Sequence, residues 1–353
     1  MAEFDPTLLF DSEMEYNVYN NRNWTEIVNF LIPIIPNFTE IIIFNVILFA
    51  ICFLGLLGNG KVIWILGFHM KRNSFSIYVL NLAVADCGVL IMLALVQIFE
   101  FFRETSFGMY VIVLLLYFML YNTSQLLLIS ISVDRCVSVL FPIWHQCHRP
   151  PKLSLIVCVI TWVLPFVCFV LEMVIGLSKS LVISEMIFSA LFPYPTVIIS
   201  TLILLVKIFI KQRQQKRKKV LMVTLLALMC FIVLRLPVNI FGIITCCMLI
   251  SNDLTWGLYD LSLESLLKNE MMGDKILDFA NIILPWIQPI IILEMVSDIC
   301  IAVNSSINPI LYFLAGRNKE DRSRVSMKLV LRRVFRNEED AKENEMQPDE
   351  TPL

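Results

Sequence analysis

An acid and an arginine, Asp134 and Arg135, follow each other directly where a long uncharged stretch from Met109 to Val133 ends. A charged residue at the centre of a bilayer costs about 2.5–3.5 kcal/mol on insertion scales, so a membrane protein seldom places two in succession without a use. The next residues form a basic turn with prolines that ends at Pro150. The pattern predicts a charge pair at the inner end of a membrane helix, placed so that it can act as a latch.

Other polar residues interrupt apolar stretches elsewhere in the chain. Lone polar groups in lipid need hydrogen-bond partners, and an Asp also needs a cation, a proton or donors. A polar cluster around Asp86 could therefore hold a small cation such as sodium. The alternative is a structural hydrogen-bond network in which Asp86 is protonated. The expected members of the cluster are Asn59, Asp86, Ser124, Asn304, Ser305 and Asn308.

These residues must be positioned by long apolar helices. The chain is 58% hydrophobic and 16% charged, whereas a soluble globular chain is about 25% charged. A span needs about twenty predominantly apolar residues. The composition predicts an all-α membrane protein, a seven-transmembrane helix bundle within residues 41–316. The expected spans are 41–68, 74–101, 109–139, 153–176, 182–210, 219–249 and 289–314.

The distribution of charge predicts the orientation of these spans. The links after the first, third and fifth spans are basic, most strongly at residues 207–219, and so is the segment after the seventh. Lys and Arg gather on the cytoplasmic side of membrane proteins. We therefore expect a multi-pass plasma-membrane protein with an extracellular amino terminus and a cytoplasmic carboxyl terminus. Residues 1–40 are acidic and carry glycosylation sequons at Asn23 and Asn37, as suits an extracellular segment.

Three further segments have their own expected structure. Residues 317–336 are basic with a stripe of apolar side chains, which predicts a short amphipathic helix on the cytoplasmic lipid surface. Residues 337–353 are acidic and almost without apolar side chains, so we expect a disordered tail. Residues 250–288 would form an unusually long third extracellular loop, and whether this is a genuine insertion stays open.

Several acids fall at or near the outer ends of spans, namely Glu100, Glu172, Glu185, Glu294 and Asp298. An apolar-walled pocket with several carboxylates would concentrate a cationic ligand; the alternative is that these groups are merely solvated in the headgroup zone. Arg235 lies deep in the sixth span, two residues before Pro237. We expect it to pair with Asp86 in place of sodium, or to reach toward Asp298.

Together these motifs resemble rhodopsin-like G-protein-coupled receptors. The resemblance rests on Gly58-Asn59, on the run from Asn81 to Asp86, on Asp134-Arg135-Cys136, on Trp162, Pro195 and Pro237, and on the run from Asn308 to Tyr312, all in order. Within that class the chain resembles the Mas-related receptors, through Met70 to Leu80, Arg135 to Pro150 and Asn304 to Pro309. The Glu at the usual position of the acid-Arg-Cys motif is here Asp134.

The resemblance implies coupling to a heterotrimeric G protein, with movement of the sixth span opening an inner cleft. The implied switch residues are Asp134, Arg135, Pro237, Asn308, Pro309 and Tyr312. Arg235 is added to them from its depth in the sixth span, at a position where Mas-related receptors have small residues. Among the acids at the outer ends of spans, the resemblance implies a ligand-binding role for Glu172, and Glu185 lies near but not at the position of a second family acid. Glu294 and Asp298 are expected to bind ligand because of their position and charge, and the expected ligand is a cationic peptide or small amine. Gly176 and Lys179 stand about where several members have a disulfide, so that bridge is not expected.

Other functions are less well matched. The sequence has no metal-spaced His/Cys cluster, phosphate-binding glycine loop or nucleophile motif, so we expect neither an enzyme nor a nucleic-acid partner, and no cofactor besides sodium. A transporter would predict matching broken helices in two halves, and no such internal symmetry is present. A ligandless seven-helix scaffold that modulates other receptors stays open as an alternative.

Overall fold

The computed structural model describes residues 38–70, 73–102, 107–150, 152–175, 193–210, 215–251 and 273–316. Within these ranges the chain is helical and contains no strand. Seven helices are long and an eighth is a short turn of helix. Their bounds are α2 Phe38–Phe68, α3 Ser74–Phe102, α4 Phe107–Leu140, α5 Pro142–Cys147, α6 Leu153–Ile175, α8 Pro193–Ile210, α9 Gln215–Ser251 and α12 Gly273–Gly316.

The long helices are built for a membrane. Six of them contain an apolar stretch long enough to cross a bilayer, and α8 contributes a shorter apolar stretch, Pro195–Val206. Only a helix satisfies all its backbone hydrogen bonds within one segment, which is why apolar runs of this length fold this way in lipid. The predicted seven-helix membrane bundle is confirmed.

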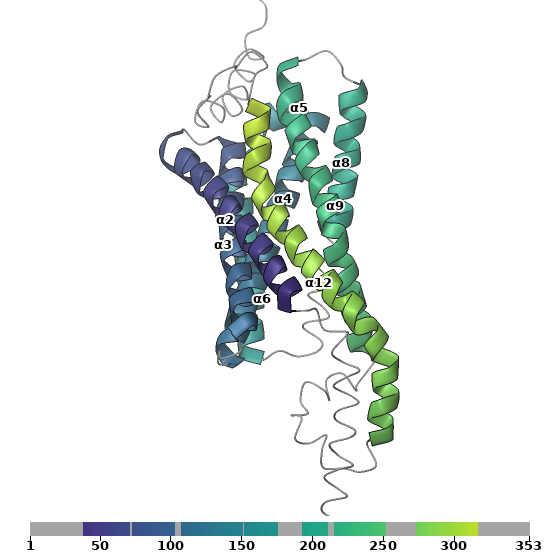
Figure 1. Ribbon diagram of the computed structural model, residues 1–353. Coiled ribbons are helices and arrows are strands. Elements are labelled where there is room, and N and C mark those ends of the chain that lie inside the picture. The colour runs from purple at the N-terminus through teal and green to yellow at the C-terminus, as the bar shows by residue number, and fades with distance from the viewer. Residues whose placement is uncertain are drawn as a thin grey trace, which may run out of the picture.

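The bundle is organised around α4. This helix packs against α3, α6 and α8, while α12 packs most extensively against α9 and α2 and so closes the ring. Figure 1 shows α12 running diagonally across the bundle in front of the other helices. The end of α4, the short α5 and the end of α12 lie at one end of the molecule, called here the α5 end.

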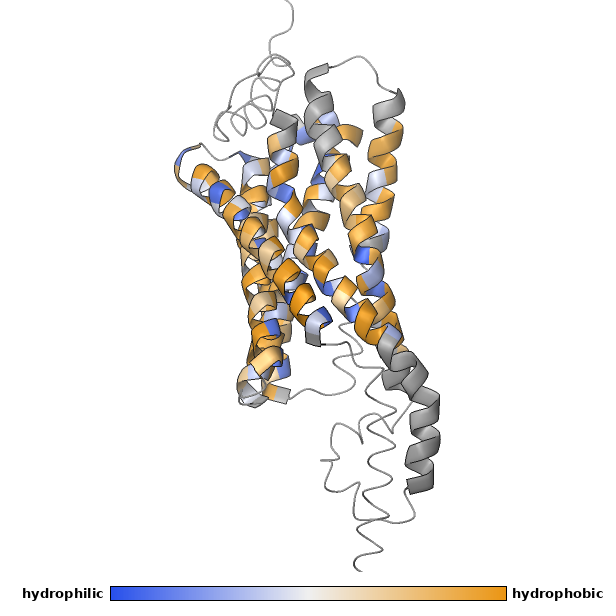
Figure 2. Ribbon diagram, viewed as in Figure 1, coloured by the Kyte–Doolittle hydropathy of each residue, from blue (hydrophilic) through white to orange (hydrophobic). Residues whose placement is uncertain are grey.

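The outer surface of the helices is apolar. On α6, the side chains of Leu155, Ile156, Val159, Ile160 and Val163 are all at least half exposed. Orange residues cover the outward faces of the bundle along most of its length in Figure 2. A contiguous apolar surface of this size would be unfavourable in water, whereas lipid is its natural solvent.

The seventh helix differs from the prediction. It was expected to begin at residue 289, but α12 begins at Gly273, so the last part of the predicted loop 250–288 is helical. The residues from Ile276 to Trp286 are mostly apolar and continue the helix without a break. The expected amino-terminal segment before Phe38, the rest of that loop, the amphipathic helix 317–336 and the tail 337–353 lie outside the described residues.

Candidate functional site

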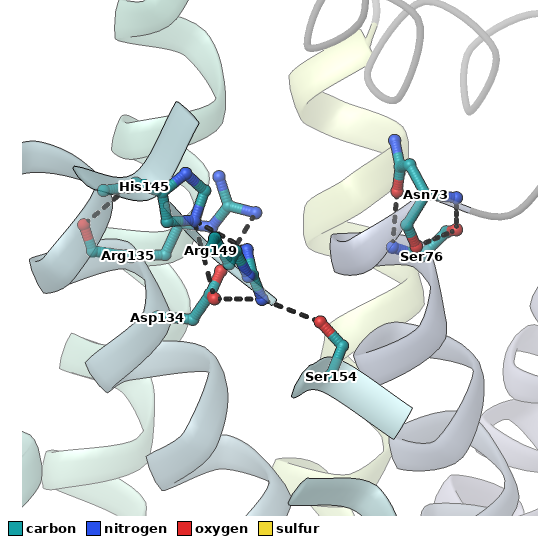
Figure 3. A network of polar contacts seen from close by, with 8 residues as sticks. Asn73, Ser76, Asp134, Arg135, His145, Arg149 and Ser154 are labelled. Atoms are coloured by element: carbon teal, nitrogen blue, oxygen red, sulfur yellow. Dashed lines mark hydrogen bonds and ion pairs between the residues drawn. The ribbon is translucent and has the colours of Figure 1, made fainter. Parts of the chain in front are cut away.

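A proline turn brings a second arginine back to the latch. Helix α4 ends at Leu140, and Pro142 occupies the first turn of α5, where its missing N–H costs nothing. The single turn of α5 then reverses the chain, so that Arg149 returns to the end of α4. Figure 3 shows Arg149 and His145 converging on Asp134 from this turn.

Asp134 is held mainly by Arg149. The Nη2 atom of Arg149 lies 2.7 Å from Oδ1 of Asp134, and both side chains are less than one-tenth exposed. The same Nη2 donates a hydrogen bond to Oγ of Ser154 at 2.7 Å, and Nη1 lies 2.6 Å from Nε2 of His145. The same Nε2 of His145 lies 3.7 Å from Oδ1 of Asp134, so it faces both Arg149 and the acid. The four side chains form one network.

Arg135 is held differently. Its Nη2 atom lies 3.9 Å from Oδ2 of Asp134, at the outer limit of an ion pair. Its guanidinium carbon lies 3.9 Å from the centre of the Phe75 ring, a cation–π distance. Arg135 thus rests on an aromatic face of α3 while its neighbouring acid is engaged elsewhere.

The start of α3 fixes the position of Phe75. The backbone N–H of Ser76 donates to Oδ1 of Asn73 at 2.7 Å, and the backbone N–H of Asn73 donates to Oγ of Ser76 at 2.8 Å. This reciprocal pair is a capping box, which satisfies donors that a helix start leaves open. Phe75 is held between the two capping residues and is 4% exposed.

A buried polar core joins three helices in the middle of the bundle. Asp86 on α3 is fully buried; its Oδ1 accepts from Oγ of Ser124 at 2.7 Å and its Oδ2 accepts from Nδ2 of Asn308 at 2.9 Å. Ser305 on α12 is buried beside this carboxyl group. Carboxylate and hydroxyl oxygens are the donors that hard cations prefer, so the residues present fit a small cation by type.

The same core links α2 to α12 closely. Nδ2 of Asn59 donates to the backbone oxygen of Ser305 at 2.8 Å and to that of Gly55 at 3.1 Å. A Cβ atom at Gly58 would lie 3.2 Å from Pro309, so the two helices nearly touch there. The other expected residues nearby, Asn304 and Tyr312, are both buried. Pro237 lies within α9 and is half-buried.

Acidic side chains gather at the end of the bundle opposite α5. Nε2 of Gln97 on α3 donates to Oδ2 of Asp298 on α12 at 3.1 Å, and the hydroxyl of Tyr110 donates to Glu100 at 2.9 Å. The charges of Glu100 and Glu294 act on Asp298. Among the described residues, no three acids, cysteines or histidines come close enough to chelate a metal ion.

The remaining predicted acids do not join this group. Glu172 is buried near the end of α6, and its charge is not among those that act on Asp298 or Glu294. The packing of α6 against α4 and α3 places it on another side of the bundle from α12. Glu185 lies outside the described residues, as do Asn23 and Asn37.

Arg235 lies over an aromatic ring of α4. Its guanidinium lies 4.7 Å from the centre of the Tyr121 ring, and Tyr121 stacks on Tyr117 with ring centres 6.0 Å apart. Asp86 accepts from donors on α4 and α12, and Asp298 accepts from Gln97. Arg235 is buried within α9, and the rotation of the helix turns it toward α4.

Sequence reasoning did not assign a role to Arg149, His145 or Ser154. Arg149 belongs to the run that carries the family resemblance, yet nothing in its type or spacing indicates that it faces Asp134. Gln97 and the Asn81–Trp162 contact were missed as well; Nε1 of Trp162 donates to Oδ1 of Asn81 at 3.1 Å and ties α6 to α3. Polar residues in spans were the available signal for Gln97.

Comparisons with known proteins agree with this architecture. Residues 58–182 match the family described as 7 transmembrane receptor (rhodopsin family). The chain is thus a G-protein-coupled receptor of the rhodopsin class, a class of receptors and not of enzymes.

Relatives that match most of the chain identify the family within this class. The chain is 30% identical to Proto-oncogene Mas of Rattus norvegicus over 307 residues, 83% of each chain. It is 32% identical to Mas-related G-protein coupled receptor member H of Mus musculus over 301 residues, 81% of each. It is 31% identical to member X1 of Homo sapiens over 293 residues, 80% of this chain and 79% of that protein. The chain belongs to the family of Mas and Mas-related G-protein-coupled receptors.

Proposed function

We propose that this receptor senses a cationic peptide or small amine outside the cell and activates a heterotrimeric G protein inside it. The observation that carries the ligand class is the gathering of Asp298, Glu294 and Glu100 on α12 and α3, at the end of the bundle opposite the latch. Carboxylates in a partly desolvated setting attract cations more strongly than the same groups in water. Glu172 and Glu185 are proposed as further ligand-binding acids from their position near the outer ends of spans, and Glu172 also from the family resemblance.

The α5 end is proposed as the cytoplasmic, G-protein-facing end. Arg135 lies there, held by Asp134 at 3.9 Å and by the face of Phe75. An agonist that binds the active arrangement better would shift a pre-existing equilibrium toward it. On activation, Arg135 would leave this position and face the inner cleft, with Asn308, Pro309 and Tyr312 on α12 and Pro237 on α9 rearranging beside it.

The ligand class is tested in cells that express the receptor and a G-protein dissociation sensor. Arg- and Lys-containing peptides and small amines are applied in increasing concentration. We expect Asp298→Asn and Glu294→Gln to raise the half-maximal concentration of an active cation about tenfold or more, a loss of about 1.4 kcal/mol. Glu40→Gln, an exposed acid at the start of α2 near the same end of the bundle, is the control and should leave it unchanged.

Coupling through the latch is tested with Arg135→Ala. At surface expression equal to that of the unchanged receptor, this variant should lose G-protein activation while keeping the ligand's binding. Full retention of signalling would contradict the role of Arg135. A receptor that responds to no cation at any concentration would instead favour the ligandless scaffold.

A further inference from the structure

The single carboxylate of Asp134 is shared unequally between two arginines. Nη2 of Arg149 lies 2.7 Å from Oδ1 of Asp134, whereas Nη2 of Arg135 lies 3.9 Å from Oδ2. The shorter contact has hydrogen-bond geometry, and charge-assisted hydrogen bonds are about twice as strong as neutral ones. In the arrangement seen here, Asp134 is therefore engaged chiefly by the turn that follows α4, and only secondarily by its neighbour in sequence.

The position of Arg149 is fixed in advance by its other contacts. Ser154 at the start of α6 accepts from its Nη2 at 2.7 Å, and His145 of α5 lies 2.6 Å from its Nη1. These partners come from two different elements, so the guanidinium is held in place without Asp134 (Figure 3). A fixed cation gives up less side-chain entropy when it pairs with the acid than a mobile one would.

From this geometry we propose that Arg149 is a positioning residue for the switch: it competes with Arg135 for Asp134 and so loosens the restraint on Arg135. Resting on the proposed coupling to a G protein, this predicts that Arg149 raises the ligand-independent activity of the receptor. Without Arg149, the basic groups left beside Asp134 are Arg135 at 3.9 Å and His145, whose Nε2 lies 3.7 Å from Oδ1. Arg135 is the permanent cation of the two, so Asp134 would turn to it, and the equilibrium would move toward the restrained, inactive arrangement.

A simpler role would be that Arg149 only fastens the turn to α4. Loss of the fastening could also lower signalling, so a single substitution does not separate the two roles. They differ in their dependence on Asp134 and Arg135. Competition requires that the contact between Asp134 and Arg135 strengthens when Arg149 is removed, whereas fastening does not.

The first experiment is a double-mutant cycle that needs neither ligand nor G protein. Thermal unfolding of the purified full-length receptor in detergent is measured for Asp134→Asn, Arg135→Ala and the pair, in the unchanged receptor and again with Arg149→Ala. The cycle isolates the coupling between residues 134 and 135. We expect a larger shift in the unfolding midpoint from this coupling in the Arg149→Ala background. Equal coupling in both backgrounds overturns the proposal.

The second experiment measures basal GTPγS binding to added heterotrimeric G protein in membranes that contain the receptor. Arg149→Ala should lower the basal rate about fivefold or more, within the usual range of couplings between sites. Asp134→Asn should raise it, and Asp134→Asn combined with Arg149→Ala should match Asp134→Asn alone. A drop of the same size in the Asp134→Asn background overturns the proposal in favour of simple fastening.

Two controls complete the design. Lys152→Ala removes a positive charge from an exposed side chain of the same link, and Ser154→Ala removes a partner of Arg149 while keeping its charge. Both should change the basal rate less than Arg149→Ala does. If no G protein responds even in the unchanged receptor, the proposed coupling fails, while the unfolding cycle still decides whether the two arginines compete.

Discussion

Asp86 is the residue that ties three helices together at the centre of the bundle. Its carboxylate accepts hydrogen bonds from Ser124 on α4 and Asn308 on α12. These contacts satisfy the group in the arrangement seen. The surrounding carboxyl and hydroxyl oxygens also form a donor set that a small cation could use. The two interpretations make different predictions about sodium.

If sodium binds at Asp86, exchanging sodium for choline in the buffer should lower the unfolding midpoint of the receptor by about 2 °C, since a ligand that binds only the folded state stabilises it. Asp86→Asn should abolish this dependence. Arg235→Ala is the control and should keep it, because the guanidinium of Arg235 lies over the Tyr121 ring of α4. An equal sodium effect in the receptor and in Asp86→Asn would leave the structural network as the role of Asp86.

At the scale of the elements, the contact between α2 and α12 depends on glycine. A Cβ atom at Gly55 would lie 2.0 Å from Oγ of Ser306, 2.8 Å from its Cβ and 2.7 Å from Cδ1 of Leu90. Rotation of one side chain does not relieve all three clashes, so the helices themselves would have to separate. The Asn59 bond to Ser305 lies one turn away and would be strained by that separation.

We therefore expect Gly55→Ala to destabilise the receptor by about 1–3 kcal/mol, the usual cost of overpacking. Gly60→Ala on the same helix is the matched control, because a Cβ there meets nothing within 4 Å. Alanine also favours a helix over glycine by up to about 1 kcal/mol, so the control should be neutral or stabilising. Unfolding midpoints in detergent measure both changes, and equal midpoints for the two variants would contradict the close approach.

At the scale of the whole molecule, the proposed function requires one orientation in the membrane. The carboxyl groups of Asp298, Glu294 and Glu100 must lie on the extracellular side, and the network of Asp134 with Arg149 must lie on the cytoplasmic side. The basic segment 207–219 and the seven acids of residues 1–40 favour this orientation through the distribution of charge.

The orientation is tested by glycosylation. With the amino terminus outside, the receptor should carry glycans that an endoglycosidase removes, and Asn23→Gln combined with Asn37→Gln should eliminate the change in gel mobility. An epitope tag at the carboxyl terminus should bind antibody only after the cells are permeabilised. A carboxyl-terminal tag accessible on intact cells would refute the orientation and, with it, the placement of the ligand site.

By itself, the sequence determined the class of fold and the depth of its functional residues. Long apolar runs specify membrane helices because each run must satisfy its backbone hydrogen bonds within the segment, and lone polar residues such as Asp86 and Asn308 must then find one another inside the bundle.

The tertiary structure decided which side chains pair with which. Asp134 has a cation beside it in sequence, yet the path of the turn after Leu140 brings Arg149 closer. Arg235 could be placed along its helix but not around it, and the rotation of α9 directs it to Tyr121. Pairing depends on distances of an ångström between helices, and no one-dimensional pattern specifies these.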